Sequence, residues 1–261
     1  MRRLVAGTGW KMNLDAAATA RYAAALAPAV AGLDDVIDMF VLPPFTSLHA
    51  AQRAFSSSAV GIGGQNMHWD ASGAWTGEIS APMLVEAGCR YVQLAHSERL
   101  EHFGETYELV RHKVNAALAA GLTPILCLGE TDDDKRRGVT DKILVEQLSL
   151  ALADQSADQV SNIILAYEPR WAIGASAAAS PDYAAERHRS LRGAIDTKFG
   201  SHAAARVRII YGGSVTPGNG AAFMDHDDIE GLFVGRAAWS PEGFAEIVAI
   251  VARAAIRRRP H

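Results

Sequence analysis

Three polar side chains follow or end short apolar segments of the sequence: a glutamate (Glu168), a histidine (His96) and a lysine (Lys11). A carboxylate in such a place is partly desolvated, which raises its pKa and makes it a better base. A neutral imidazole can donate a hydrogen bond to a carbonyl that gains negative charge, and a lysine offers an anion a fixed positive charge. Each residue also has a structural interpretation: a helix-capping carboxylate, a histidine packed under a loop, and a solvated lysine.

The residues after the histidine favour the chemical interpretation. Ser97 suits the N-cap position, so we expect a helix to start there. A histidine at a helix N-terminus lies at the positive end of the helix dipole, which keeps its ring neutral. Glu98 follows closely, and we expect its carboxylate to pair with Lys11.

Two glycine-bearing turns follow other apolar segments. One contains Gly212, Gly213 and Ser214, and the other contains Gly235 and Arg236. Backbone N–H groups in such turns, with a helix N-terminus behind them, form a nest for an anion. The sequence therefore predicts a phosphate site at these turns.

The segment after Glu168 has the character of a closing lid. Pro169 and Trp171 give a stiff hinge, and an apolar tip ends at Gly174. A glycine can bring its backbone amide close to a phosphate. We expect the lid to cover about Trp171–Ser176.

Short apolar segments alternate along the chain with helical patterns. Continuous apolarity is typical of strands buried on both faces of a parallel sheet. Eight strands with helices between them predict one (β/α)8 barrel domain over residues 1–261, whose chemistry lies at the carboxyl ends of the strands. A doubly wound sheet is the alternative, although no GxGxxG follows the first strand. The predicted strands are Leu4–Lys11, Met39–Leu42, Val60–Gln65, Tyr91–Ala95, Pro124–Leu128, Ile163–Glu168, Arg208–Tyr211 and Leu232–Val234, and helices are predicted in Ala16–Ala31, Glu105–Ala120 and Asp141–Leu152.

The composition argues against several classes of protein. The net charge of -4 over 261 residues gives no electrostatic footprint for nucleic acid. No apolar run is long enough for a membrane span or a signal peptide. Cys89 and Cys127 have no metal-ligand spacing, so we expect reduced thiols in the cytoplasm and no metal site.

Six motifs, in order along the chain, together resemble the triosephosphate isomerase family. The resemblance implies a TIM barrel that interconverts aldose and ketose phosphates without a metal or organic cofactor. For a triose substrate it implies a place in glycolysis and gluconeogenesis. The motifs are Trp10-Lys11-Met12-Asn13, Thr76-Gly77-Glu78, Ala95-His96-Ser97-Glu98-Arg99, Tyr167-Glu168-Pro169, Trp171-Ala172-Ile173-Gly174 and Tyr211-Gly212-Gly213-Ser214.

The resemblance also implies a role for each matching residue. Glu168 moves a proton between two carbons, His96 polarises the substrate oxygens, and Lys11 stabilises the enediolate. The substrate phosphate lies between the amides near Gly174, Gly213, Ser214, Gly235 and Arg236. In the family, a loop matching Asn66–Glu78 enters a neighbouring subunit, which implies a homodimer with Thr76 near the partner's site.

Several positions depart from the usual family pattern. Gly9 stands where the family has an asparagine whose amide touches the reacting oxygens, and the turn after the last strand reads Gly235-Arg236 instead of Gly-Gly. These departures resemble the branch that isomerises L-erythrulose 1-phosphate, which shares the missing asparagine, the Gly-Arg turn and the His68-Trp69 pair in the third loop. Gly9 also leaves room for a fourth carbon. The alternatives are an ordinary triosephosphate isomerase and a barrel that binds phosphosugars without turnover.

Overall fold

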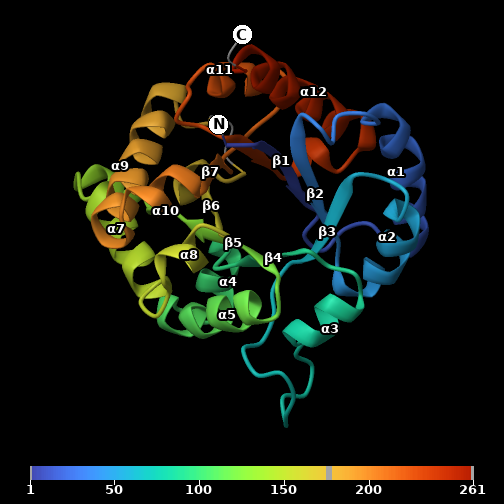
Figure 1. Ribbon diagram of the computed structural model, residues 1–261, viewed down its shortest axis with the longest axis horizontal. Coiled ribbons are helices and arrows are strands. Elements are labelled where there is room, and N and C mark those ends of the chain that lie inside the picture. Colours follow the sequence, from blue (N-terminus) through green and yellow to red (C-terminus); the bar gives the residue numbers. More distant parts are fainter. Residues whose placement is uncertain (1, 175–177, 260–261) are drawn as a thin grey trace.

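A closed barrel of parallel strands forms the centre of the molecule (Figure 1). The computed structural model describes residues 2–174 and 178–259. In these residues each strand pairs with the next and β8 pairs with β1, so the predicted (β/α)8 barrel is confirmed and an open doubly wound sheet is not formed. The strands are β1 (Leu4–Gly9), β2 (Ile37–Leu42), β3 (Val60–Gly64), β4 (Tyr91–Leu94), β5 (Thr123–Leu128), β6 (Ile164–Tyr167), β7 (Arg208–Tyr211) and β8 (Gly231–Val234).

Helices form a ring outside the barrel. The three predicted helical segments are all present, as α1, α5 and α7. Their starts follow local capping: Asp15 and Thr106 each accept a hydrogen bond from a backbone N–H three residues on. The helices are α1 (Ala16–Ala29), α2 (Leu48–Phe55), α3 (Ala81–Glu86), α4 (Ser97–His102), α5 (Tyr107–Ala119), α6 (Asp132–Arg136), α7 (Thr140–Ala151), α8 (Ala157–Val160), α9 (Pro181–Phe199), α10 (Ser201–Arg206), α11 (Gly220–Met224) and α12 (Pro241–Arg257), with the 3-10 turns η1 (Phe45–Ser47), η2 (Arg170–Ala172) and η3 (Arg236–Ala238).

The first strand is shorter than the sequence predicts. It ends at Gly9, two residues before Lys11. Lys11 has φ +52°, a left-handed conformation that residues with a Cβ seldom adopt and that cannot continue a strand. The side-chain amide of Gln65 donates to the carbonyl oxygen of Lys11 at 2.8 Å and so holds this strained backbone in place.

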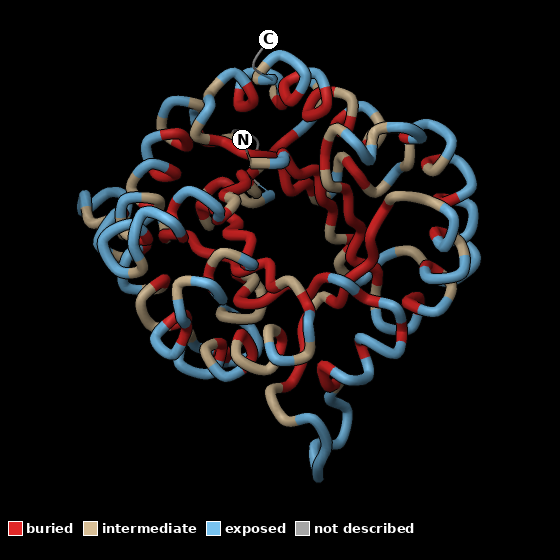
Figure 2. The backbone as a smooth tube through the Cα atoms, in the orientation of Figure 1, coloured by how far each residue is buried: buried red, intermediate tan, exposed pale blue. Residues whose placement is uncertain are grey.

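Two apolar cores make the barrel rigid. One fills its interior, and the other lies between the strands and the surrounding helices. Figure 2 shows the buried strands inside a ring whose exposed residues face outward. The interior core consists of Val5, Phe40, Leu42, Tyr91, Ile125, Cys127, Ile164, Ala166, Ile210 and Phe233. Close packing of these side chains fixes the strand ends that carry the polar residues.

One long loop departs from the compact outline. The chain between β3 and α3 extends away from the body (Figure 1), and residues 71–78 are exposed (Figure 2). Its aromatic side chains pack on each other, with His68 stacked on Trp69 at 4.1 Å and next to Trp75 at 4.3 Å between ring centroids. Along the described part of the chain, no helix is long and apolar enough to cross a membrane.

Candidate active site

Glu168 follows β6 directly and lies at the mouth of the barrel. Its side chain is almost completely buried, and its Oε2 has no hydrogen-bond partner among the described residues. Burial raises the pKa of this carboxyl above its usual range, although a protonated His96 and the charge of Lys11 oppose the shift. The carboxylate is therefore desolvated, and its pKa lies closer to neutrality than that of an exposed glutamate, as a general base requires.

The backbone around Glu168 leaves no room for side chains at two neighbouring glycines. A Cβ on Gly212 would lie 2.6 Å from Cγ of Glu168, and a Cβ on Gly129 would lie 1.9 Å from its carbonyl oxygen. Such contacts are too short for real atoms. The two glycines therefore allow β5 and β7 to approach the base from both sides.

His96 ends the loop after β4 and caps α4 with its own ring. Its Nδ1 accepts a hydrogen bond from the backbone N–H of Glu98 at 3.2 Å, and α4 begins at Ser97. Ser97 is therefore the first helical residue and the prediction that it is the N-cap is wrong, since the imidazole supplies the acceptor. An accepting Nδ1 places the proton of the neutral ring on Nε2, which lies 3.9 Å from Oε2 of Glu168.

Lys11 and Glu98 form the predicted pair. Nζ of Lys11 lies 2.5 Å from Oε1 of Glu98. Burial acts to raise the pKa of the Glu98 carboxyl, but the hydrogen bond from Lys11, a protonated His96 and the charge of Lys11 together hold it below its usual value. An ionised Glu98 fixes the lysine ammonium in front of the cavity.

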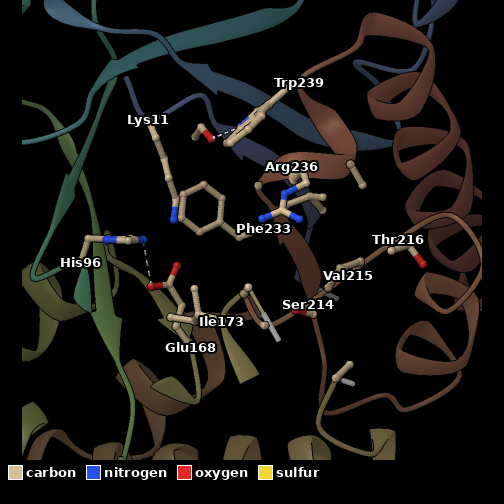
Figure 3. Close-up of a pocket in the computed structure, with 18 of the residues that line it drawn as sticks. Lys11, His96, Glu168, Ile173, Ser214, Val215, Thr216, Phe233, Arg236 and Trp239 are labelled. Atoms are coloured by element: carbon tan, nitrogen blue, oxygen red, sulfur yellow. Dashed lines mark hydrogen bonds and ion pairs between the residues drawn. The ribbon is translucent and has the colours of Figure 1, made fainter. Parts of the chain in front are cut away.

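One cavity of about 450 Å³ joins these groups to the glycine-bearing turns. Figure 3 shows Lys11, His96 and Glu168 pointing toward one another, with Arg236 reaching in from the opposite wall. The predicted site residues in the wall are Gly9, Lys11, His96, Glu168, Gly174, Gly213, Ser214, Gly235 and Arg236. Glu98 stands behind Lys11, and Thr76 lies far out on the exposed loop, so neither lines the cavity.

The wall opposite the base has the features of an anion site. Ser214 donates its hydroxyl hydrogen to the carbonyl oxygen of Ala172 at 2.7 Å, and Asn219 donates to the carbonyl oxygen of Ser214 at 3.0 Å. η3 begins at Arg236, whose exposed side chain makes no ion pair with any described residue. A free guanidinium beside backbone amides is suited to a doubly charged oxyanion.

The base of the predicted lid is held by several contacts. Nε1 of Trp171 donates to Oε1 of Glu130 at 2.7 Å, and Nζ of Lys135 lies 3.3 Å from the centre of the Trp171 indole. Arg170 forms an ion pair with Glu101 on α4 at 2.5 Å. Ala175 and Ser176, at the far end of the predicted lid, lie outside the described residues.

Sequence reasoning missed several cavity residues. Gln93, Phe233 and Trp239 all line the cavity, and Nε1 of Trp239 donates to the carbonyl oxygen of Gly9 at 3.3 Å. Gln93 is a polar residue inside the predicted strand Tyr91–Ala95, which was the available signal. Phe233 carried none, because an aromatic residue inside a strand usually belongs to the core.

The profile of the triosephosphate isomerase family matches residues 4–251. The chain belongs to this family. It is 45% identical to a triosephosphate isomerase of Symbiobacterium thermophilum over 98% of this chain and 100% of the relative. It is 44% identical to an L-erythrulose-1-phosphate isomerase of Rhizobium etli over 97% of this chain and 94% of the relative. It is 42% identical to a triosephosphate isomerase of Solibacter usitatus over 95% of this chain and 99% of the relative.

Family membership makes the chain an isomerase of a small sugar phosphate. Relatives with the two names have nearly equal identity to it. Overall similarity therefore does not choose between a three-carbon and a four-carbon substrate, and the choice must be argued from the site.

Proposed function

We propose that this enzyme isomerises a four-carbon ketose phosphate of the L-erythrulose 1-phosphate type in preference to a triose phosphate. The observation that carries the proposal is Gly9, which leaves the cavity wall beside Lys11 without a side chain. A Cβ built on Gly9 would be in ordinary contact, at 3.6 Å, with the ring of Phe233. The space is therefore usable but limited, and it suits one additional hydroxymethyl group.

The chemistry of the substrate agrees with this location. In L-erythrulose 1-phosphate, carbon 1 carries the phosphate ester and carbon 2 is the carbonyl. The carbonyl can move only to carbon 3, which also bears the terminal hydroxymethyl group, so the product is again a ketose phosphate. With the phosphate held at the glycine turns, the extra group points to the opposite end of the cavity, toward Gly9.

The proposed mechanism uses residues already placed around the cavity. Glu168 takes the proton from carbon 3, and the C–H electrons form the enediolate double bond while the carbonyl oxygen becomes negative. Nε2–H of His96 donates to the reacting oxygens, and the ammonium of Lys11 balances the charge. Glu168 then returns its proton to carbon 2, while the proton of the carbon 3 hydroxyl passes to the oxygen on carbon 2, so that carbon 3 becomes the new carbonyl. Exclusion of water protects the enediolate from loss of its phosphate.

The phosphate is assigned to the wall opposite the base. The amides near Gly174, Gly213, Ser214 and Gly235 would donate to its oxygens. The guanidinium of Arg236 would add a charged, two-pronged contact.

The deciding experiment compares kcat/KM for glyceraldehyde 3-phosphate and for L-erythrulose 1-phosphate in the wild type and in Gly9→Asn. The four-carbon substrate should be preferred by the wild type, and the added amide should move the preference toward the triose. A triose preference above tenfold, with a ratio that Gly9→Asn leaves unchanged, would sink the proposal.

A homodimer completes the proposal. The loop Asn66–Glu78 carries Trp75, which is 48% exposed, and Met12 and Phe103 elsewhere on the surface are 95% and 67% exposed. Exposed apolar side chains of this size favour burial against a second copy. Sedimentation should give a dimer at micromolar concentration, and a fully active monomer would contradict it.

The cytoplasmic location remains a prediction from the two buried free thiols.

A further inference from the structure

The side-chain amide of Gln93 lies inside the barrel and makes few hydrogen bonds with described residues. It lies on β4, is 6% exposed and lines the cavity. Its Nε2 makes one weak contact, to Sγ of Cys127 at 3.5 Å. No described residue donates a hydrogen bond to its Oε1, and this oxygen is not among the fully enclosed polar atoms that lack a partner. The amide therefore has hydrogen-bonding capacity that is open to a ligand in the cavity.

The amide of Gln93 lies next to the missing side chain of Gly9. A Cβ built on Gly9 would be 3.7 Å from Oε1 of Gln93. A longer side chain at position 9 would therefore extend toward the space beside this amide. We propose that Gln93 determines substrate length: its amide takes over the polar contact absent at Gly9 and binds the substrate hydroxyl farthest from the phosphate.

The Cys127 contact leaves this amide free to serve a substrate. Burial, followed by the charge of Glu168, raises the pKa of the Cys127 thiol well above its usual value, so the thiol stays protonated. A neutral thiol is only a weak donor and a weak acceptor. The thiol can hydrogen-bond weakly to either the NH2 group or the oxygen of the Gln93 amide. A substrate hydroxyl, which both donates and accepts, can then bind the other end of the amide.

This inference rests on the proposed four-carbon substrate, because a triose phosphate lacks the fourth carbon and the hydroxyl that it carries. Gln93→Met keeps the length of the side chain and removes the amide. We expect kcat/KM for L-erythrulose 1-phosphate to fall about 10- to 100-fold, as for a buried hydrogen bond that leaves its partner unpaired. The ratio of the four-carbon to the three-carbon kcat/KM should fall about 10-fold.

Two further variants separate binding from packing. Gln52→Met makes the same change on the exposed surface of α2 and should leave both rates as they are. Gly9→Asn combined with Gln93→Met restores an amide from the other side of the same space and should recover part of the lost activity. Thermal melts of every variant show whether the fold is intact.

The outcomes distinguish this inference from the proposed function. A wild type that turns over neither substrate refutes the proposed function. In that case Gln93 is tested by calorimetry, which measures the binding of L-erythrulose 1-phosphate and of dihydroxyacetone phosphate to the wild type and to Gln93→Met. A Gln93→Met enzyme that loses activity or affinity equally for both compounds makes Gln93 a packing residue and overturns the inference. Unchanged discrimination by a fully active variant overturns it too.

Discussion

The two ends of the barrel differ in how fully their charged side chains are paired. At the amino ends of the strands, arginines are matched to carboxylates: Arg3 and Arg208 bind Asp38, while Arg192 binds the buried Glu230 through both carboxylate oxygens at 2.6 Å. Glu230 also accepts from Arg2 and from the backbone N–H of Ile209.

At the carboxyl ends, two charged groups lack a close partner. Oε2 of Glu168 has no hydrogen-bond partner and lies 3.9 Å from Nε2 of His96, and Arg236 has no ion pair, each judged over the described residues. The paired charges hold strands and helices together, whereas the charged groups without a close partner can still form an ion pair or a hydrogen bond with a ligand. Burial and charge alone do not mark a site, but incomplete pairing beside a cavity does.

The largest effect is expected from removing the unpaired base. Glu168→Gln keeps the size of the side chain and cannot accept a proton, so kcat should fall about 10⁴-fold, equivalent to about 5.5 kcal/mol. Steady-state kinetics measures the loss, and far-UV circular dichroism checks the fold. Retention of a tenth of the activity would exclude Glu168 as the base.

The matched end should respond in stability and not in rate. Glu230→Ala leaves Arg192 and Arg2 without their buried carboxylate, and we expect a loss of about 3–5 kcal/mol in the free energy of unfolding. Urea denaturation measures it, and kcat of the folded variant should be that of the wild type. Asp38→Asn, at a half-buried pair, is the control with a smaller loss. A selective fall in kcat without destabilisation would break the contrast between the two ends.

A weaker effect is expected at the unpaired arginine. Arg236→Gln removes the charge but keeps a donor, so KM should rise about 10- to 100-fold, as for a charge-assisted hydrogen bond of roughly 1.5–3 kcal/mol. The affinity for inorganic phosphate, measured by calorimetry, should fall in parallel and lose part of its salt dependence. Arg236→Lys should recover some of it. An unchanged phosphate affinity would remove Arg236 from the site.

The smallest effect concerns pH and stability at Glu168. Its pKa is raised in the folded state, so the protonated form is favoured by folding, and the stability it contributes is complete below the unfolded pKa of about 4.3. That stability is lost as pH rises through the folded pKa. Glu168→Gln should therefore melt at a higher temperature than the wild type at neutral pH, and the difference should shrink near pH 4. An equal difference at both pH values would mean that burial of the charge is not the cause.

Much of the fold follows from local patterns in the sequence. Eight apolar segments and three helical stripes predict the barrel, because a parallel strand is buried on both faces and cannot alternate. The boundary at Lys11 could not be predicted, since its φ of +52° depends on Gln65, which is distant in the sequence. Periodicity alone carries no information about such a contact.

The grouping of Glu168, His96 and Lys11 around one cavity was predictable, because each lies within two residues of the carboxyl end of a strand. The site was not predictable where function depends on two distant elements together. Gln93 acquires its meaning only when β4 and β1 bring it next to Gly9. His96 caps its own helix through a ring orientation that the residue type alone does not fix.

The two glycines beside the base have a consequence for evolution. A change from glycine to alanine is among the smallest that a gene can make, yet at Gly212 or Gly129 the added methyl would collide with Glu168. Substitution is therefore disfavoured at two positions that contribute no side chain to the reaction. A descendant that replaces either glycine must shift Glu168, so we expect such a replacement to lower activity even where Glu168 itself is retained.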